Sequence, residues 1–504
     1  MKKVLVLMAV AILLFVNQGC DPENVLDELD NTSGSTELSS DYVWADNDRV
    51  NIILNGTSAT ADSSVVLING TTVTITAAGN YQITGSLTNG QLVVDADSGV
   101  VRIKLSGVSL VNSSTSPFFI KNSAKTIVFL GDGTTNSVAD ASVYANADEP
   151  NAAIFSNGYL AFTGSGSLTV KGSYNDGISS DDELIVNSGV INVSAKDDAV
   201  RGKNFLKITD GTITAVASAG HALKSDNEDK AGYGYVKVDG GVLNLTSSSA
   251  DGIHGVKRVI INGGTTTISA SGSQGLHADS LLIINGGNTT IKASKEGVES
   301  PLISMVNGNL SITATDDGFN ATYGNGGESS DNSLLAISGG SVYINASGGD
   351  GLDSNGNITM SGGTVVVNGP KSQPEVGLDY NGTFKISGGL LIISAVNSNM
   401  TQGTSTSSSQ YSLKLSTSSS IAAGTLFHIQ DASGNSLVTF KGERAYTSVI
   451  FSSYDLVKGA TYSIYTGGTS TGTLSYGLYT GGVYSGGTLK KTITISSVVT
   501  SVTF

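Results

Sequence analysis

The sequence has few of the residues that cross-link a chain or bind soft metals. It holds one cysteine, four histidines and six prolines among 504 residues, and aromatic residues make up 6 %. A single cysteine cannot form an internal disulfide, so a folded core must hold the chain together. The four histidines are dispersed along the sequence and no Cys/His spacing accompanies them, so we expect no zinc site.

Charge is also scarce and is unevenly divided. Charged residues make up 14 % of the chain and the formal net charge is −15, which disfavours a nucleic-acid partner. The apolar content of 39 % is too high for a disordered chain. There is no Walker loop, no G-x-S-x-G elbow and no context for a cysteine nucleophile. No window shows a sustained helical period, which makes helical repeats a poor fit.

What the chain has instead is one short phrase repeated nine times: an acidic or polar residue, a small residue, and an aliphatic or aromatic one. The first positions are 176, 198, 221, 251, 274, 296, 317, 350 and 376, so successive spacings are 22, 23, 30, 23, 22, 21, 33 and 26. A turn that ends in glycine keeps step, at 189, 211, 241, 264, 287, 308, 340, 363 and 389. Self-similarity at such a period predicts a solenoid.

The period and the residues between the phrases select the kind of solenoid. Short runs rich in Val, Ile and Thr alternate with Gly and Asn, which is typical of strands and turns. About 22 residues divide into three strands and three turns, so we predict an all-β, right-handed parallel β-helix with three strands per coil. The third positions of the phrase should stack inward, about 4.8 Å apart. Glycine at the second position predicts a bend with positive φ.

Composition outside the repeats predicts the domain organisation. Lys2 and Lys3 precede an apolar run, so residues 1–19 are predicted to be a lipoprotein signal peptide that places a lipid on Cys20. The alternative for Cys20 is an incidental thiol. Residues 20–42 are expected to be an acidic flexible tether, 43–397 the β-helix, 401–409 a linker, and 410–504 a small β-sandwich-like domain. These features predict an exported monomer on the outer membrane at the cell surface, held to the membrane only by its lipid.

Three groups of acidic residues are candidate metal ligands. Carboxylates about 5 Å apart repel one another unless a cation lies between them, and hard oxygen ligands suit Ca²⁺. The alternative is that each Asp accepts hydrogen bonds from backbone in a turn. For the cluster at 176, 197 and 198 we favour metal. The candidates are Asp176, Asp181, Asp182, Asp197 and Asp198 in the first group, Asp226 and Asp251 with Asn227 and Asp229 in the second, and Asp316, Asp317, Asp350 and Asp353 in the third.

Three residues after each first position comes a second column. Its members are Ser179, Arg201, Lys224, His254, His277, Glu299, Asn320, Asp353 and Asp379. Four of them in succession form a cationic ladder from Arg201 to His277, which would suit a long anionic ligand lying along the axis. The alternative is a set of separately solvated charges.

The residues of two neighbouring coils resemble a known family. The run 175–186, which contains Asn175-Asp176-Gly177-Ile178, and the run 197–203, Asp-Asp-Ala-Val-Arg-Gly-Lys, resemble the bacterial carbohydrate-binding β-helix family that is similar to family nine pectate lyases. The resemblance covers about residues 43–396. It implies a calcium-bearing β-helix that binds cellulosic and acidic plant polysaccharides such as polygalacturonate. The expected carbohydrate-binding residues are Arg201, Lys203, Lys224, His254 and His277.

The same resemblance raises the question of catalysis. The lyase relatives hold catalytic Ca²⁺ with clustered Asp residues and use a Lys as the base. Here Arg201 stands where the lyase-like motif has another Asp, and only Lys203 and Lys224 are candidate bases. We therefore assign no catalytic residue. The expected function is calcium-dependent capture of acidic or cellulosic polysaccharide at the cell surface, and the alternatives are a calcium-dependent polysaccharide lyase and a non-enzymatic adhesin.

Overall fold

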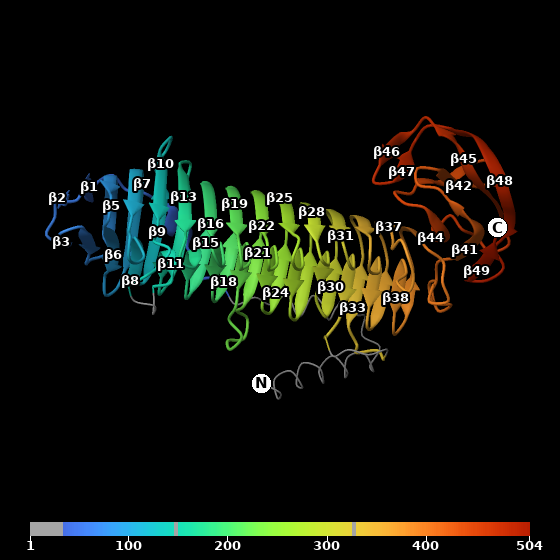
Figure 1. Ribbon diagram of the computed structural model, residues 1–504, viewed down its shortest axis with the longest axis horizontal. Helices are drawn as coiled ribbons and strands as arrows, with labels where there is room; N and C mark the ends of the chain where they lie inside the picture. The colour runs from blue at the N-terminus through green and yellow to red at the C-terminus, as the bar shows by residue number, and fades with distance from the viewer. Residues whose placement is uncertain (1–33, 146–149, 325–328) are drawn as a thin grey trace.

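The computed structural model describes residues 34–145, 150–324 and 329–504, so Cys20 and the predicted signal peptide lie outside the described residues. Figure 1 shows a long stack of coils with a separate module at its C-terminal end. Within the described ranges no helix is long and apolar enough to cross a membrane. The predicted all-β fold, a parallel β-helix with three strands per coil and a C-terminal β module, is confirmed.

Three parallel sheets run along the stack, and each coil gives one strand to each. The sheet that starts each repeat, here called the groove sheet, contains β6 (Gln91–Asp95), β8 (Phe118–Asn122), β11 (Ala152–Ser156), β14 (Asp176–Ser180), β17 (Val200–Gly202), β20 (Leu223–Ser225), β23 (Ile253–Gly255), β26 (Leu276–Ala278), β29 (Val298–Glu299), β32 (Phe319–Ala321), β35 (Leu352–Ser354) and β38 (Leu378–Tyr380). The second contains β9 (Lys125–Leu130), β12 (Leu160–Gly164), β15 (Glu183–Val186), β18 (Phe205–Ile208), β21 (Tyr235–Val238), β24 (Arg258–Ile261), β27 (Leu281–Ile284), β30 (Leu302–Met305), β33 (Leu334–Ile337), β36 (Asn357–Met360) and β39 (Phe384–Ile386). The third contains β10 (Thr135–Ala139), β13 (Ser167–Gly172), β16 (Val190–Ala195), β19 (Thr212–Ala217), β22 (Val242–Ser247), β25 (Thr265–Ala270), β28 (Asn288–Ser294), β31 (Asn309–Ala314), β34 (Ser341–Ala346), β37 (Thr364–Asn368) and β40 (Leu390–Ala395).

The inward ladder predicted from the phrase is present in register. Ile178 pairs with Val200, Val200 with Leu223, and the pairing continues coil by coil to Leu378. Every member is buried. Because side chains on a strand alternate between its two faces, this register places the residue after each ladder position on the outer face of the groove sheet.

Glycine plays two different roles in the coil, and one prediction about it is wrong. The turn glycines at 189, 211, 241, 264, 287, 308, 340, 363 and 389 all have positive φ. The glycines at the second position of the phrase do not. These positions hold glycine because the neighbouring coil lies too close for a side chain. A Cβ on Gly318 would lie 2.4 Å from the carbonyl oxygen of Gly351 and 2.4 Å from Cγ2 of Ile344. Space, and not backbone conformation, selects glycine there.

The first coils and the chain before them close the N-terminal end. The strands are β1 (Arg49–Gly56), β2 (Ala59–Ala61), β3 (Val66–Asn69), β4 (Thr72–Ile75), β5 (Gly79–Leu87) and β7 (Val100–Val111). Antiparallel partners cover the first edges, since β2 pairs with β1 and β3 with β4. The long strand β7 then pairs with both β9 and β10, where the coil divides into separate strands.

Residues 35–44, the N-terminal strap, lie against the side of the solenoid and include the 3₁₀ helix η1 (Ser39–Tyr42). Glu37 pairs with Lys207 at 2.8 Å and Asp41 with Lys125 at 2.6 Å. Trp44 packs edge-on against Phe129 at 5.4 Å. The described part of the predicted flexible tether is therefore bound, because its acidic residues meet lysines on the outer faces of β9 and β18.

The C-terminal module continues the last coil. It contains β41 (Ser412–Ile421), β42 (Leu426–Asp431), β43 (Ser436–Lys441), β44 (Tyr446–Ser452), β45 (Thr461–Ser470), β46 (Thr473–Ser475), β47 (Leu478–Thr480), β48 (Tyr484–Thr494) and β49 (Val499–Thr503). Strand β44 pairs antiparallel with β40, and a six-stranded sheet completes the module. The predicted linker at 401–409 instead caps β39: the Ser405 N–H donates to the Phe384 carbonyl at 2.7 Å.

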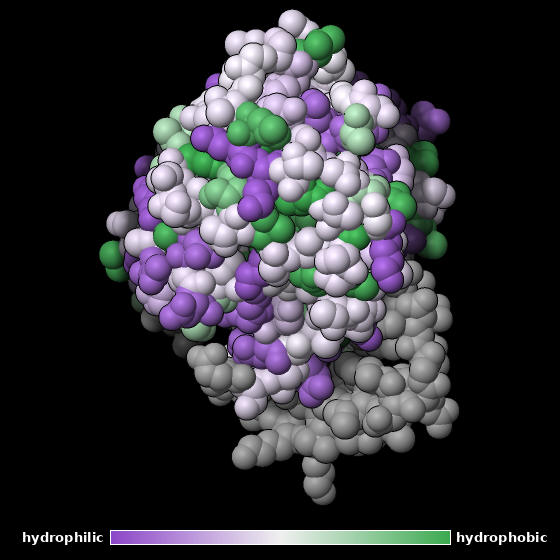
Figure 2. Space-filling model, turned by 90° about the vertical axis from the view of Figure 1, so that its right-hand side faces the viewer, coloured by the Kyte–Doolittle hydropathy of each residue, from purple (hydrophilic) through white to green (hydrophobic). Residues whose placement is uncertain are grey.

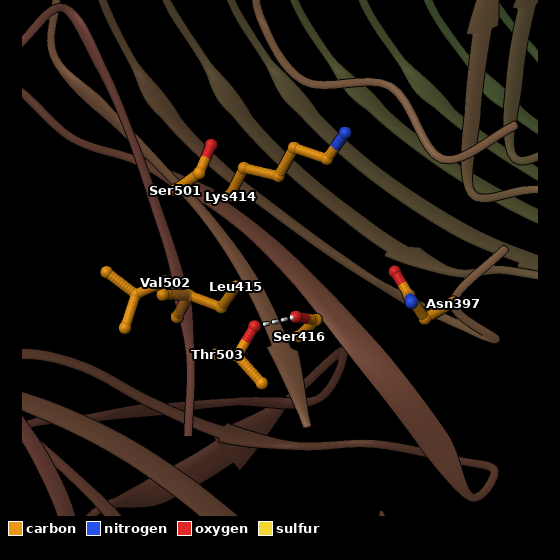
Figure 3. Close-up of a pocket in the computed structure, with 7 residues that line it drawn as sticks. All are labelled: Asn397, Lys414, Leu415, Ser416, Ser501, Val502 and Thr503. Atoms are coloured by element: carbon orange, nitrogen blue, oxygen red, sulfur yellow. Dashed lines mark hydrogen bonds between the residues drawn. The ribbon is translucent and has the colours of Figure 1, made fainter. Parts of the chain in front are cut away.

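The outer surface of this module is mixed in polarity. Figure 2 looks onto this end of the molecule and shows hydrophobic residues scattered among hydrophilic ones, and the exposed apolar side chains include Leu474, Val483 and Leu489. A small cavity of about 160 Å³ is lined by Asn397, Lys414, Leu415, Ser416, Ser501, Val502 and Thr503 (Figure 3). The ammonium of Lys414 already donates to the Thr401 carbonyl.

Candidate functional site

Two rows of polar side chains run along the groove sheet. The first row is formed by the first positions of the phrase: Asp176, Asp198, His221, Asp251, Gln274, Glu296, Asp317 and Asp350. The second row is the column predicted from the sequence, and strand register pairs each of its members with the next, from Ser179 through Arg201 and Lys224 to Asp379. The two rows form one polar strip that follows the axis of the solenoid.

Side chains of the first row satisfy backbone groups of the next coil. The N–H of Asp198 donates to Oδ1 of Asp176 at 3.2 Å, and the N–H of His221 donates to Oδ1 of Asp198 at 2.8 Å. The same bond recurs from Asp350 N–H to Asp317 Oδ1 at 2.6 Å. Backbone capping, the alternative considered for these residues, thus occupies one carboxylate oxygen. The other oxygen of each Asp remains for the second row.

At the N-terminal end of the strip, acids and bases alternate. Arg201 Nε donates to Asp226 Oδ2 at 2.9 Å, and Lys224 Nζ lies 3.0 Å from Asp198 Oδ2. Burial would lower the pKa of both bases, but these carboxylates outweigh it and hold each pKa above its usual value. Burial and the charge of Asp198 raise the pKa of Asp176 to about 8.

The first two members of the cationic ladder are paired with acids. Its charges are not stacked without partners, because Asp198 and Asp226 stand between Arg201 and Lys224. The insertion at residues 226–232 supplies Asp226, while Asn227 holds the turn by accepting from the Asp229 N–H at 3.1 Å. Lys203, two residues after Arg201 in the sequence, is exposed. Three other acids lie in this region. Asp181 is 3.6 Å from Arg201, and Asp182 accepts a hydrogen bond from Asn204. Burial and the charge of Asp198 raise the pKa of Asp197.

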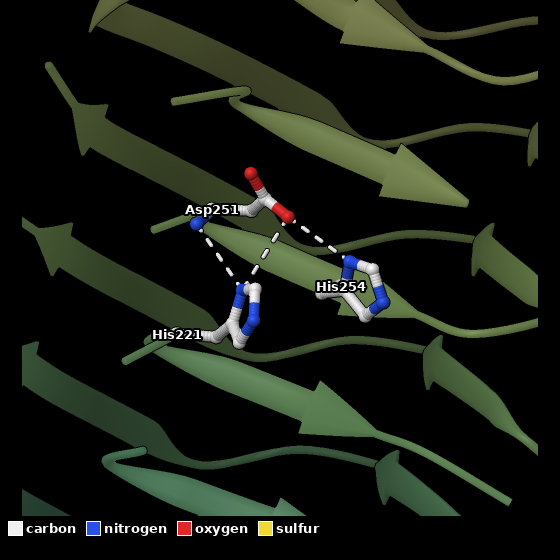
Figure 4. Close-up of side chains that lie close together, drawn as sticks. All are labelled: His221, Asp251 and His254. Carbon is white, nitrogen blue, oxygen red and sulfur yellow. Dashed lines mark hydrogen bonds and ion pairs between the residues drawn. The ribbon is translucent and has the colours of Figure 1, made fainter. Parts of the chain in front are cut away.

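In the middle of the strip the structure brings three of the four histidines together, contrary to the expectation that they are dispersed. Oδ2 of Asp251 lies 3.0 Å from Nδ1 of His254, 3.1 Å from Nδ1 of His277 and 3.4 Å from Nδ1 of His221. Figure 4 shows His221 and His254 on either side of Asp251. Burial would raise the pKa of Asp251, but the close contacts of its carboxylate with the imidazoles hold that pKa well below its usual range.

At the C-terminal end of the strip, carboxylates gather with few bases. Ligand oxygens of Asp350, Asp353 and Asp379 all lie within 4.8 Å of one another. Burial and neighbouring carboxylates raise the pKa of Asp350 to about 7 and that of Asp353 to about 8. Burial, followed by the charge of neighbouring acids, raises the pKa of Asp317 to about 9. Lys295 approaches Asp316 only to 3.8 Å and is itself half exposed.

Among the described residues, this acidic group is the all-carboxylate set that could hold a metal ion. It is a different group from the cluster at 176, 197 and 198 favoured from sequence, near which Arg201 lies 3.6 Å from Asp181 and Lys224 lies 3.0 Å from Asp198. That cluster stays a prediction. Sequence reasoning placed Asp379 in the second row but did not name it as a ligand. The register that pairs Asp353 with Asp379 was the signal that could have found it.

Comparison with known proteins identifies a family. A family described as carbohydrate-binding domain-containing protein matches residues 69–318 and 274–436, well over half of the chain. A carbohydrate-binding domain-containing protein of Acetivibrio thermocellus is 30 % identical over 199 residues, 38 % of this chain, and the chain spans 65 % of that relative's length. A solved structure of a polysaccharide lyase-like protein from C. thermocellum, a gadolinium derivative, is 29 % identical with a TM-score of 0.45, over 47 % of this chain and 96 % of that one. The chain belongs to the family of carbohydrate-binding domain-containing proteins.

Proposed function

We propose that this protein captures acidic polysaccharide, such as polygalacturonate, at the cell surface in a calcium-dependent manner. The observation that carries the proposal is the group Asp350, Asp353 and Asp379 on an open strip of a carbohydrate-binding solenoid. Attachment through a lipid on Cys20 and a position on the outer membrane are part of the proposal. Cellulosic glycan is the second candidate ligand.

The residues of this group fit calcium. Ca²⁺ prefers several oxygen ligands and tolerates flexible geometry, and three carboxylates supply the negative charge that it neutralises. The raised pKa values of Asp350 and Asp353 express the cost of burying these carboxylates and of holding their charges close together. Asp350, Asp353 and Asp379 would hold the ion, whose remaining positions can accept carboxylate oxygens of a uronate chain.

The same face offers positive groups to an extended anionic chain. Arg201 and Lys224 remain partly exposed although each pairs with an acid, and Lys203 is exposed. A polymer that lies along the strip would meet these bases at one end and calcium at the other. The separation of the two regions by several coils favours a long ligand over a single sugar.

Two observations favour binding over cleavage. A lyase base must lose its proton near neutral or alkaline pH, so its pKa has to be lowered. The carboxylates of Asp198 and Asp226 raise the pKa of Lys224, and those of Asp226 and Asp176 raise the pKa of Arg201. Arg201 and Lys224 are thus held in their charged forms, which suits attraction of an anion.

Retention on immobilised polygalacturonate should require calcium and the acidic group. We expect wild-type protein to elute when a chelator replaces Ca²⁺, and Asp353→Asn to be retained at least about 10-fold more weakly in Ca²⁺, because one charged ligand is lost. Affinity electrophoresis in gels containing polygalacturonate measures both effects.

The matched control is Asp239→Asn, an acid of the turn after β21 on another face of the coil. It should be retained like wild type. Equal retention of wild type and Asp353→Asn, with and without Ca²⁺, would contradict calcium-dependent capture. Release of unsaturated product that raises the ultraviolet absorbance would favour the lyase alternative.

A further inference from the structure

The histidine group in the middle of the strip has the geometry of a transition-metal site. Oδ2 of Asp251, Nδ1 of His254 and Nδ1 of His277 form a triangle with edges of 3.0, 3.1 and 3.2 Å. Ligand atoms about 2.0–2.1 Å from a tetrahedral zinc ion stand about 3.3 Å apart. The three atoms therefore match one face of a zinc coordination sphere.

The neighbours of this triangle leave its atoms available. Oδ1 of Asp251 accepts the N–H of Gln274 at 3.1 Å, which fixes the carboxylate and leaves Oδ2 toward the imidazoles. Asp279 lies behind the rings, with Oδ1 3.6 Å from Nε2 of His277 and 3.9 Å from Nε2 of His254. Histidines that bind metal through one nitrogen commonly give the other N–H to a carboxylate, and Asp279 faces both Nε2 atoms at distances slightly longer than a hydrogen bond.

His221 belongs to the cluster but not to the triangle. Its Nδ1 accepts the backbone N–H of Asp251 at 3.1 Å, so the lone pair that would bind a metal is already used. The ring packs against that of His254 at 4.7 Å and forms one wall of the group (Figure 4). The ring of His221 and the buried Asp251 together limit the movement of the metal ligands.

We propose that Asp251, His254 and His277 form a binding site for Zn²⁺ or a similar divalent transition metal, separate from the calcium group. Three protein ligands leave one position of a tetrahedral ion unfilled. His254 and His277 are 15 % and 24 % exposed, so this position opens toward the solvent-facing strip, where it can take water or an oxygen of a bound ligand. The site does not depend on the proposed function.

Zinc titration of the purified, metal-free chain, carrying no histidine tag, tests the proposal. We expect one high-affinity Zn²⁺ per chain by calorimetry, undiminished by millimolar Ca²⁺ because imidazole ligands favour zinc. His277→Gln should weaken binding by at least about 100-fold, and Asp279→Asn by about 10-fold, the range seen when an outer partner is lost. His428→Gln, which removes the one histidine outside the cluster, should bind like wild type.

Each outcome bears on the proposal. Co²⁺ added to wild type should give the visible absorption of a tetrahedral site, and His277→Gln should not. The half-exposed Asp279 can be replaced without disturbing the core, so its variant reports on the site even if His277→Gln does not fold. The assignment would be overturned if wild type did not bind Zn²⁺ stoichiometrically. It would also be overturned if wild type, His277→Gln and Asp279→Asn bound Zn²⁺ with equal affinity.

Discussion

Lowering the pH from about 8.5 to about 5.5 in the presence of a chelator should raise the melting temperature, by about 5 °C or more. Most proteins do not gain stability on mild acidification, but five carboxyl groups of this strip have raised pKa values: Glu296 and Asp350 about 7, Asp176 and Asp353 about 8 and Asp317 about 9. A folded-state pKa above the unfolded value gives stability that is fully present below the unfolded pKa and is lost as the pH rises through the folded pKa. These groups therefore destabilise the fold progressively between about pH 4 and about pH 9.

Calcium and amide substitutions should reduce this pH dependence. Saturating Ca²⁺ should raise the melting temperature more at pH 8.5 than at pH 5.5, because it binds the ionised group in the native state. Asp317→Asn mimics the protonated acid and keeps an oxygen for the Asp350 N–H, so its melting temperature in chelator should depend less on pH. Differential scanning fluorimetry across the pH series checks this. A melting temperature that falls on acidification in wild type would contradict the charge repulsion inferred here.

Replacing a single packed glycine should cost a large share of the stability. Gly318→Ala places a methyl group 2.4 Å from the Gly351 carbonyl oxygen and 2.4 Å from the Ile344 side chain. Two coils must move apart to admit it, and overpacking of this kind costs about 1–3 kcal/mol or more. We expect a clear loss in the denaturant midpoint, followed by circular dichroism at the β-sheet band.

A second glycine provides the control. Gly158→Ala has its nearest non-neighbour atom at 3.5 Å, an ordinary contact, and should change the free energy of unfolding by less than about 0.5 kcal/mol. Natural alanine at 199 and 222, both fully buried, shows that some coils accept a methyl group at this position. Equal midpoints for Gly318→Ala and wild type would mean that the close approach of coils is not tight.

The fold could be predicted because one register determines the whole stack. Once Ile178 and Val200 are aligned, every later ladder residue follows, and so does the pairing of Arg201 with Lys224 and of His254 with His277. Repeats in a solenoid contact only their neighbours, so a periodic sequence is enough to place them. The role of the packed glycines was missed because a distance between coils leaves no mark in a single repeat.

The chemistry of the strip was harder to predict, since it depends on groups outside the repeat. Asp226 comes from an insertion and pairs with Arg201 and Lys224, a contact that the spacing of the repeat does not predict. His221, His254 and His277 are separated in the sequence by intervals of 33 and 23 residues, yet they meet around one carboxylate. Sequence spacing alone shows which coil holds each side chain, but not which way it turns.

The closed ends of the solenoid determine how long the molecule can be. Parallel coils present open strand edges, and such edges invite another chain to add itself as the next coil. Here β2 and β3 turn back on the first strands, and β44 with residues 401–410 occupies the last ones. The covered ends prevent other protein chains from adding further coils, so the polar strip has a fixed number of coils. The amino-acid sequence therefore sets the length of polysaccharide that the strip can bind.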